Sequence, residues 1–232
     1  MSVWSEITEF LANLAGEAMS TVIEAVLTVF EGDPETRKQV GFSVAMIALS
    51  AKMAKADGIV TEDEVVAFQQ IFEIPPEEAK NVSRLYNLAK EDVAGFQAYA
   101  SKVKRLFPEE QEILVDVMDG LFHIAKADGI VHEKELAFMD TVSEIFDVRD
   151  KEYQRIRLRH MEPEDGDPYI LLDADPDWSD EELKSHHRKL VRENHPDSLI
   201  ARGVPSEFIA IANERLAGIN KAWEQVALQR GL

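Results

Sequence analysis

The sequence predicts an all-α protein in which a helical bundle precedes a small helical hairpin. Apolar residues recur at steps of three and four along most of the chain, and no segment shows the alternation typical of a strand. The segment AKADGIV occurs twice, at 54–60 and 125–131, which indicates a duplicated helix–loop–helix unit. Near the C-terminus, two amphipathic segments flank the tripeptide His195-Pro196-Asp197, as two helices joined by a loop would do.

The first segment, residues 1–34, is predicted to form an amphipathic helix. Its apolar face consists of Val3, Ile7, Phe10, Leu11, Leu14, Ala18 and Val22. The segment contains no Lys or Arg, whereas helices that bind anionic lipid usually present basic side chains. We therefore expect it to pack on protein, which is its own bundle, a second copy in a homodimer, or another chain.

No targeting or membrane-spanning segment is predicted. The N-terminus lacks the positively charged start of a signal peptide. The longest run without a charged residue, 39–51, is too short to span a bilayer, which takes about 20 residues. We therefore expect a cytoplasmic protein without a transmembrane segment, with peripheral membrane association as the alternative.

The composition excludes several classes of function. The chain of 232 residues has a net charge of −19, and such an acidic surface repels phosphate backbones, so direct binding of nucleic acid is not expected. It has no cysteine, which rules out disulfides, cysteine nucleophiles and thiolate metal sites. It also lacks a nucleotide-binding loop and a plausible set of nucleophile and base, so we do not expect an enzyme.

The repeated segment predicts how the bundle is built, because each copy joins two helices through a loop. The expected helices lie near 37–56, 61–73, 109–127 and 132–147, with one or two more within 76–106. Gly58 and Gly129 would end the first helix of each pair in the left-handed conformation. In the first copy Thr61 and Glu64 form a capping box, whereas His132 is a poor cap in the second.

The pattern KADGxVxxxE, present in both copies, resembles the TerB-like (tellurite-resistance B) domain over residues 35–160. The resemblance implies an all-helical bundle, and it suggests a divalent cation as a cofactor at the two loops. The carboxylates available to bind the cation are Asp57, Glu64, Asp128 and Glu135. The loops are not EF-hands, because Met53 and Lys55 occupy ligand positions in the first copy. The alternative is a purely structural motif.

The C-terminal hairpin has clear helix signals. Ser179 and Glu182 form a capping box at its start, and Pro196 disfavours helix at His195, where the first helix should end. Lys184, Arg188 and Arg192 recur at steps of four and form a basic stripe. The second helix should begin near 205–206. Its apolar face consists of Ile209, Ala212, Leu216, Ile219, Trp223 and Val226.

Residues 167–227 resemble the J domain of DnaJ-type co-chaperones, in particular the membrane-type DnaJ-like protein A branch. The matching motifs are DPY at 167–169, RKLVRxxHPD at 188–197 and INKAW at 219–223. The resemblance implies a DnaK-type ATPase chaperone as partner. The residues that it implies for docking are His195, Pro196, Asp197, Lys184, Arg188, Lys189 and Arg192. His187 and Ser198 depart from the pattern, which commonly has Tyr and Lys there.

The sequence thus predicts an amphipathic N-terminal helix (1–34), a TerB-like bundle with an internal pseudo-repeat (35–160), a linker (161–167) and a J-domain hairpin (168–232). The expected function is that of a co-chaperone that stimulates a DnaK-type ATPase, with the bundle supplying client, partner or location specificity. Two alternatives remain at this point: a metal-responsive stress sensor with the J domain as output, and a metal-dependent hydrolase that uses the repeat carboxylates.

Overall fold

The computed structural model describes residues 7, 23, 34–57, 74–76, 78–91, 95–127, 129–161 and 166–232. Every regular element in this part of the chain is helical, which confirms the all-α prediction. The elements are α3 (Pro34–Asp57), α5 (Ala79–Glu91), α6 (Phe96–Leu106), α7 (Gln111–Ala125), α8 (Glu133–Ile145), α9 (Asp150–Met161), α10 (Pro168–Leu171), α11 (Asp180–Glu193), α12 (Pro196–Arg202), η1 (Ser206–Phe208) and α13 (Ile209–Arg230).

Two predicted helices, over 1–34 and 61–73, lie outside the described residues apart from Ile7 and Ile23, which are helical and buried. The helices predicted near 37–56, 109–127 and 132–147 correspond to α3, α7 and α8, and 76–106 contains α5 and α6. Within the described part of the chain, no helix is long and apolar enough to cross a membrane.

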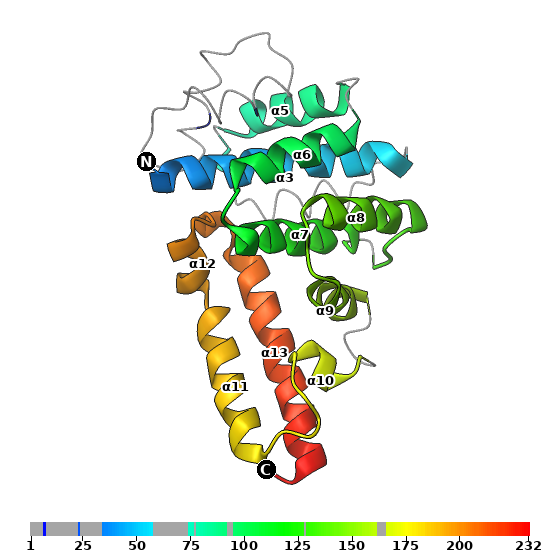
Figure 1. Ribbon diagram of the computed structural model, residues 1–232. Helices are drawn as coiled ribbons and strands as arrows, with labels where there is room; N and C mark the ends of the chain where they lie inside the picture. The colour runs from blue at the N-terminus through cyan, green and yellow to red at the C-terminus, as the bar shows by residue number, and fades with distance from the viewer. Residues whose placement is uncertain are drawn as a thin grey trace.

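The helix α3 forms the centre of the bundle. It packs against α5, α6, α7 and α8, which surround it in Figure 1. Residues 40–54 of α3 are buried without interruption, so this helix is enclosed on all sides rather than amphipathic, and it buries Ser43, Ser50 and Lys52 with its apolar residues. The second repeat loop, between α7 and α8, contains Gly129 at φ +92°, the left-handed conformation that the sequence predicted.

The helices α11 and α13 form the predicted hairpin, which extends away from the bundle in Figure 1. A small apolar cluster lies between the two helices and α10 at the far end of the hairpin. Its buried members are Leu172, Leu183, Leu190, Ile219, Ala222 and Val226. The near end differs from the prediction, since a third helix, α12, begins within the HPD tripeptide at Pro196 and packs against the bundle.

The near end of the hairpin shares the hydrophobic core of the bundle. Five buried residues from the hairpin region belong to that core: Leu199, Val204, Phe208, Ile211 and Ala212. The rings of Phe208 and Phe42 meet edge to face, with centroids 4.6 Å apart. Glycines allow the close approach: a Cβ at Gly120 would lie 3.0 Å from Ile211 Cδ1, and one at Gly203 would lie 2.8 Å from Lys38 Cβ.

A buried cluster of charged residues joins α7, α9 and α13 beside this core. Asp119 on α7 accepts hydrogen bonds from Arg159 Nη1 at 2.5 Å, His160 Nε2 at 2.8 Å and Arg215 Nε at 2.7 Å. Burial raises the pKa of Asp119, but Arg159, Arg215 and His160 outweigh burial and hold that pKa well below its ordinary value. Burial lowers the pKa of His160, although the hydrogen bond with Asp119 opposes the shift.

A second ionic contact joins α13 to the end of α7. Glu214 on α13 pairs with His123 and Lys126. Burial raises the pKa of Glu214. Its hydrogen bonds with His123 and Lys126 lower that pKa by more than burial raises it, so the pKa falls to about 2. The hairpin is therefore attached to the bundle by apolar packing and by two groups of ionic contacts.

These pKa values predict that acid weakens the protein. A carboxylate with a depressed pKa in the folded state contributes stability above its unfolded pKa, and this contribution is lost as the pH falls towards the folded pKa. For Glu214 the window runs from the ordinary value of 4.5 down to about 2. Between pH 5 and 3, the free energy of unfolding of the wild type should therefore fall by about 2 kcal/mol more than that of Glu214→Gln. Urea denaturation at each pH measures the difference, and parallel curves for the two proteins would contradict the assignment.

Candidate functional site

The HPD tripeptide lies at the start of α12, on the side of the hairpin tip that faces solvent. The side chains of His195 and Asp197 are 52% and 89% exposed. His195 is the N-cap of α12, and its Nδ1 accepts a hydrogen bond from the backbone amide of Asp197 at 3.2 Å. The imidazole therefore caps a helix as well as facing solvent, which sequence reasoning did not anticipate. The Asp197 carboxylate stays accessible to a partner.

Contacts from α12 to the end of α11 keep this loop compact. Ser198 Oγ donates to the carbonyl oxygen of Arg192 at 2.7 Å, and Arg202 Nη1 donates to that of Glu193 at 3.1 Å. These bonds provide donors for carbonyl groups at the end of α11 that would otherwise have no hydrogen-bond partner within the helix. Ser198, a departure from the J-domain pattern, thus has a structural role in this chain.

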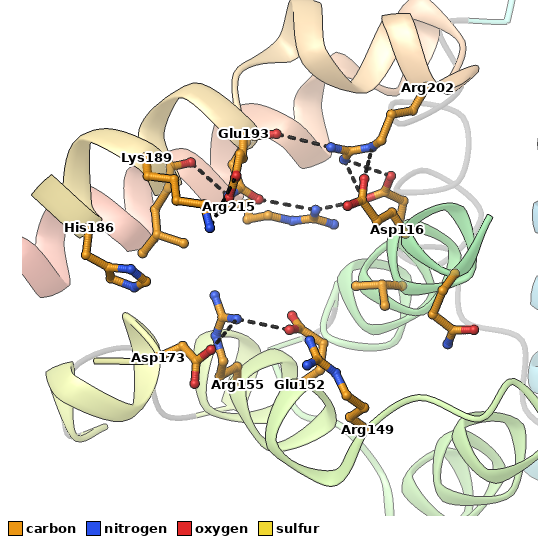
Figure 2. A pocket seen from close by; sticks show the side chains of 15 residues that line it. Asp116, Arg149, Glu152, Arg155, Asp173, His186, Lys189, Glu193, Arg202 and Arg215 are labelled. Carbon is orange, nitrogen blue, oxygen red and sulfur yellow. Dashed lines mark hydrogen bonds and ion pairs between the residues drawn. The ribbon is translucent and has the colours of Figure 1, made fainter. Parts of the chain in front are cut away.

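The basic residues predicted for docking occupy two faces of α11. Lys184, Arg188 and Arg192 are exposed and share one face, as their spacing predicts. Lys189 is also exposed, at 59%, but it pairs with Glu193 at 3.8 Å and faces a cleft of about 490 Å³ between the hairpin and the bundle. Figure 2 shows Lys189 and His186 on one wall of this cleft, opposite α9. The structure thus separates Lys189 from the other three.

The two adjacent histidines of α11 hold the hairpin together. His187 stacks on Trp223 with ring centroids 4.7 Å apart, and its Nε2 donates to Asn220 Oδ1 at 3.2 Å. Partial burial lowers the pKa of His187, although the hydrogen bond to Asn220 opposes this. His186 Nε2 donates to the carbonyl oxygen of Leu172 at 2.7 Å. The stacked pair explains how His187, at a position where Tyr is common, fits against Trp223.

The candidate cation site is described only in part. Glu135 is 1% exposed, and its Oε2 accepts a hydrogen bond from the backbone amide of His132 at 2.9 Å, so this carboxylate caps α8. Asp57 is the last residue of α3, and its side chain lies outside the described part, as do Glu64 and Asp128. Among the described residues, no group of three or more His, Asp or Glu side chains could hold a metal ion. The cation site stays a prediction.

Sequence reasoning missed the charged residues that connect the hairpin to the bundle. The missed set comprises Asp116, Asp119, Arg159, His160, Arg202 and Arg215. One signal was present, because two aspartates three positions apart in the apolar segment ILVDVMDGLF must share a buried face. Their partners were not readable, since they come from distant segments of the chain.

Comparisons with known proteins agree with this architecture. The family model described as tellurite resistance protein TerB matches residues 43–158. The co-chaperone protein DjlA of Photobacterium profundum is 23% identical over 220 residues, covering 84% of this chain and 79% of the relative. The protein of that name from Shewanella oneidensis is 24% identical, with 87% and 82% covered. That of Legionella pneumophila is 21% identical, with 88% and 81% covered.

No solved structure matches the chain significantly. The family match covers α5 to α8 and most of α3 and α9, and the three relatives match 84–88% of the chain. The chain therefore belongs to the tellurite resistance protein TerB family, and it has the DnaJ-like architecture in which a TerB-like helical bundle is combined with a J domain.

Proposed function

We propose that this chain is a co-chaperone that recruits a DnaK-type chaperone through its J domain and stimulates the ATPase of that partner. The observation that carries the proposal is the exposed HPD loop at the end of a helix that presents a basic stripe. His195 and Asp197 face solvent directly beyond α11, and the stripe of Lys184, Arg188 and Arg192 leads up to them. The name co-chaperone protein DjlA, given to the relatives, supports the same role.

The basic stripe of α11 supports a partner with an acidic docking surface. The chain as a whole has a net charge of −19, so a stripe of three exposed cations is a local reversal. Such a stripe steers an acidic partner and raises the rate of association more than it raises final affinity. We assign docking to this stripe and the loop, and client or location specificity to the bundle. On this proposal the chain activates the partner's ATPase and catalyses no reaction of its own.

The first test replaces His195 in two ways. His195→Gln removes the imidazole together with the cap of α12, whereas His195→Asn keeps a capping side chain because Asn is a strong N-cap. Both variants should lose stimulation of a DnaK-type ATPase, measured as steady-state phosphate release, while circular dichroism shows unchanged helix content. Stimulation by His195→Gln within about twofold of wild type would contradict the proposal. If His195→Asn stimulates the ATPase and His195→Gln does not, His195 acts only as a cap.

The second test concerns the basic stripe. Arg188→Glu should slow association with the chaperone by about tenfold at low salt, with a smaller effect on dissociation, because rim charges act mainly through steering. Stopped-flow binding at several ionic strengths measures both rates. The matched control is Lys151→Glu, a charge reversal at an exposed position of α9. An association rate of the wild type that does not change with salt, or an equal effect of the control, would contradict docking through this stripe.

A further inference from the structure

The HPD loop is fastened to the bundle through a buried carboxylate of α7. Arg215 donates from Nη1 to Asp116 Oδ1 at 2.7 Å, and Arg202 donates from Nη2 to Asp116 Oδ2 at 3.1 Å. The Asp116 side chain is only 2% exposed, so water cannot replace these partners. The two arginines come from α13 and α12, the helices that follow the loop. Figure 2 shows Asp116 between them.

Both arginines also reach the residues that precede the loop. Arg202 Nη1 donates to the carbonyl oxygen of Glu193 at 3.1 Å, and Arg215 Nη1 lies 3.5 Å from Asn194 Oδ1. Glu193 ends α11 and Asn194 is its C-cap, directly before His195. Contacts that start from one carboxylate therefore extend to the chain on both sides of the HPD tripeptide.

The other side of α12 is anchored by apolar packing. Leu199, two residues after Asp197, is 3% exposed and belongs to the core of the bundle. The helix that begins at the tripeptide is thus held by an apolar anchor at Leu199 and an ionic anchor at Arg202, while the side chains of His195 and Asp197 remain exposed. A loop held at two points in this way has little conformational freedom to lose when a partner binds.

We propose that Asp116 is a positioning residue, by which the TerB-like bundle holds the HPD loop in the conformation that the DnaK-type chaperone binds. The inference rests on the proposed function above. If the loop visits other conformations, the apparent dissociation constant rises in inverse proportion to the fraction of competent molecules. Asp116 acts through the arginines and is itself buried, so it should affect the concentration needed for stimulation rather than the maximal stimulation.

Other contacts keep the hairpin on the bundle when Asp116 is altered. Arg215 still donates from Nε to Asp119 at 2.7 Å, Glu214 still pairs with α7, and Phe208 remains in the core. Asp116, by contrast, pairs with both arginines whose side chains reach the residues before the loop. Its removal should therefore loosen the loop more than it loosens the fold.

The test uses the full chain with Asp116→Asn, which preserves the shape of the side chain and removes its charge. The concentration that gives half-maximal stimulation of a DnaK-type ATPase should rise about five- to tenfold, while maximal stimulation stays near that of wild type. Backbone amides of residues 197–200 should exchange with solvent about tenfold faster, whereas those of α5 and α8 keep their rates. Arg202→Gln, at a side chain that is 23% exposed, should give the same pattern and serves as the second variant if Asp116→Asn folds poorly.

Arg230→Gln is the matched control, because Arg230 clamps the far end of the hairpin. Arg230 donates to Tyr169 Oη at 3.1 Å, to the carbonyl oxygen of Trp178 at 3.1 Å and to Asp180 Oδ1 at 3.2 Å. Its loss should lower the melting temperature and leave both the half-maximal concentration and the exchange of the loop unchanged. If Arg230→Gln raised the half-maximal concentration and the loop exchange as much as Asp116→Asn does, a general loss of stability would explain both variants. That result would overturn the proposal.

Two results separate this inference from the proposed function. If the wild type stimulates the ATPase but Asp116→Asn and Arg202→Gln match it in half-maximal concentration and in loop exchange, the positioning role is wrong and the co-chaperone function stands. If the wild type does not stimulate, the proposed function fails. The exchange rates of residues 197–200 then decide alone whether Asp116 fixes the loop.

Discussion

The pairing of Asp116 and Asp119 with Arg215 is the interaction on which the arrangement of this protein depends. Two carboxylates of α7 and one guanidinium of α13 meet in a region where all three side chains are at least nine-tenths buried. A buried charge without a counter-charge is strongly unfavourable, so these side chains are stable here only while they face one another or another buried partner. The pairing therefore fixes which faces of the two helices meet.

This pairing sets the orientation in which the apolar surfaces of α13 and the bundle meet. Phe208 and Ile211 would gain similar free energy from burial against many apolar surfaces, since burial of apolar area has no preferred orientation. The charged cluster admits only one register of α13 on α7, and in that register α12 lies against the bundle with the HPD loop outside. The far half of the hairpin has its own small core and needs no such support. The bundle and the J domain thus meet at the end of the hairpin where the chaperone is proposed to dock.

Much of the fold and of the docking loop could be predicted from the sequence, because the signals are local. Helical spacing, the capping box of Ser179 and Glu182, and the left-handed Gly129 each follow from residues a few positions apart, and the structure contains all three. The HPD motif with its flanking helices likewise identified the J domain, an identification that the comparisons confirm.

The connection between the two halves could not be predicted, because it depends on residues far apart in the chain. Leu199 packs in the core of the bundle, and nothing near it in the sequence indicates this. Asp116 and Asp119 were visible as acids in an apolar helix, but Arg215 lies about a hundred residues away. Lys189 was assigned with its basic neighbours through the resemblance to the J domain, and its place on the cleft follows only from how the hairpin sits.

The central claim is that a chaperone docks on the HPD loop and α11 while the bundle holds that loop in place. Amide exchange of the full chain, with and without a DnaK-type chaperone and ATP, tests this claim most directly. The account predicts slower exchange on binding at residues 184–200, with the bundle helices α5 and α8 unchanged. Protection of α5 or α8 without protection at residues 184–200 would place the docking surface on the bundle and contradict the account.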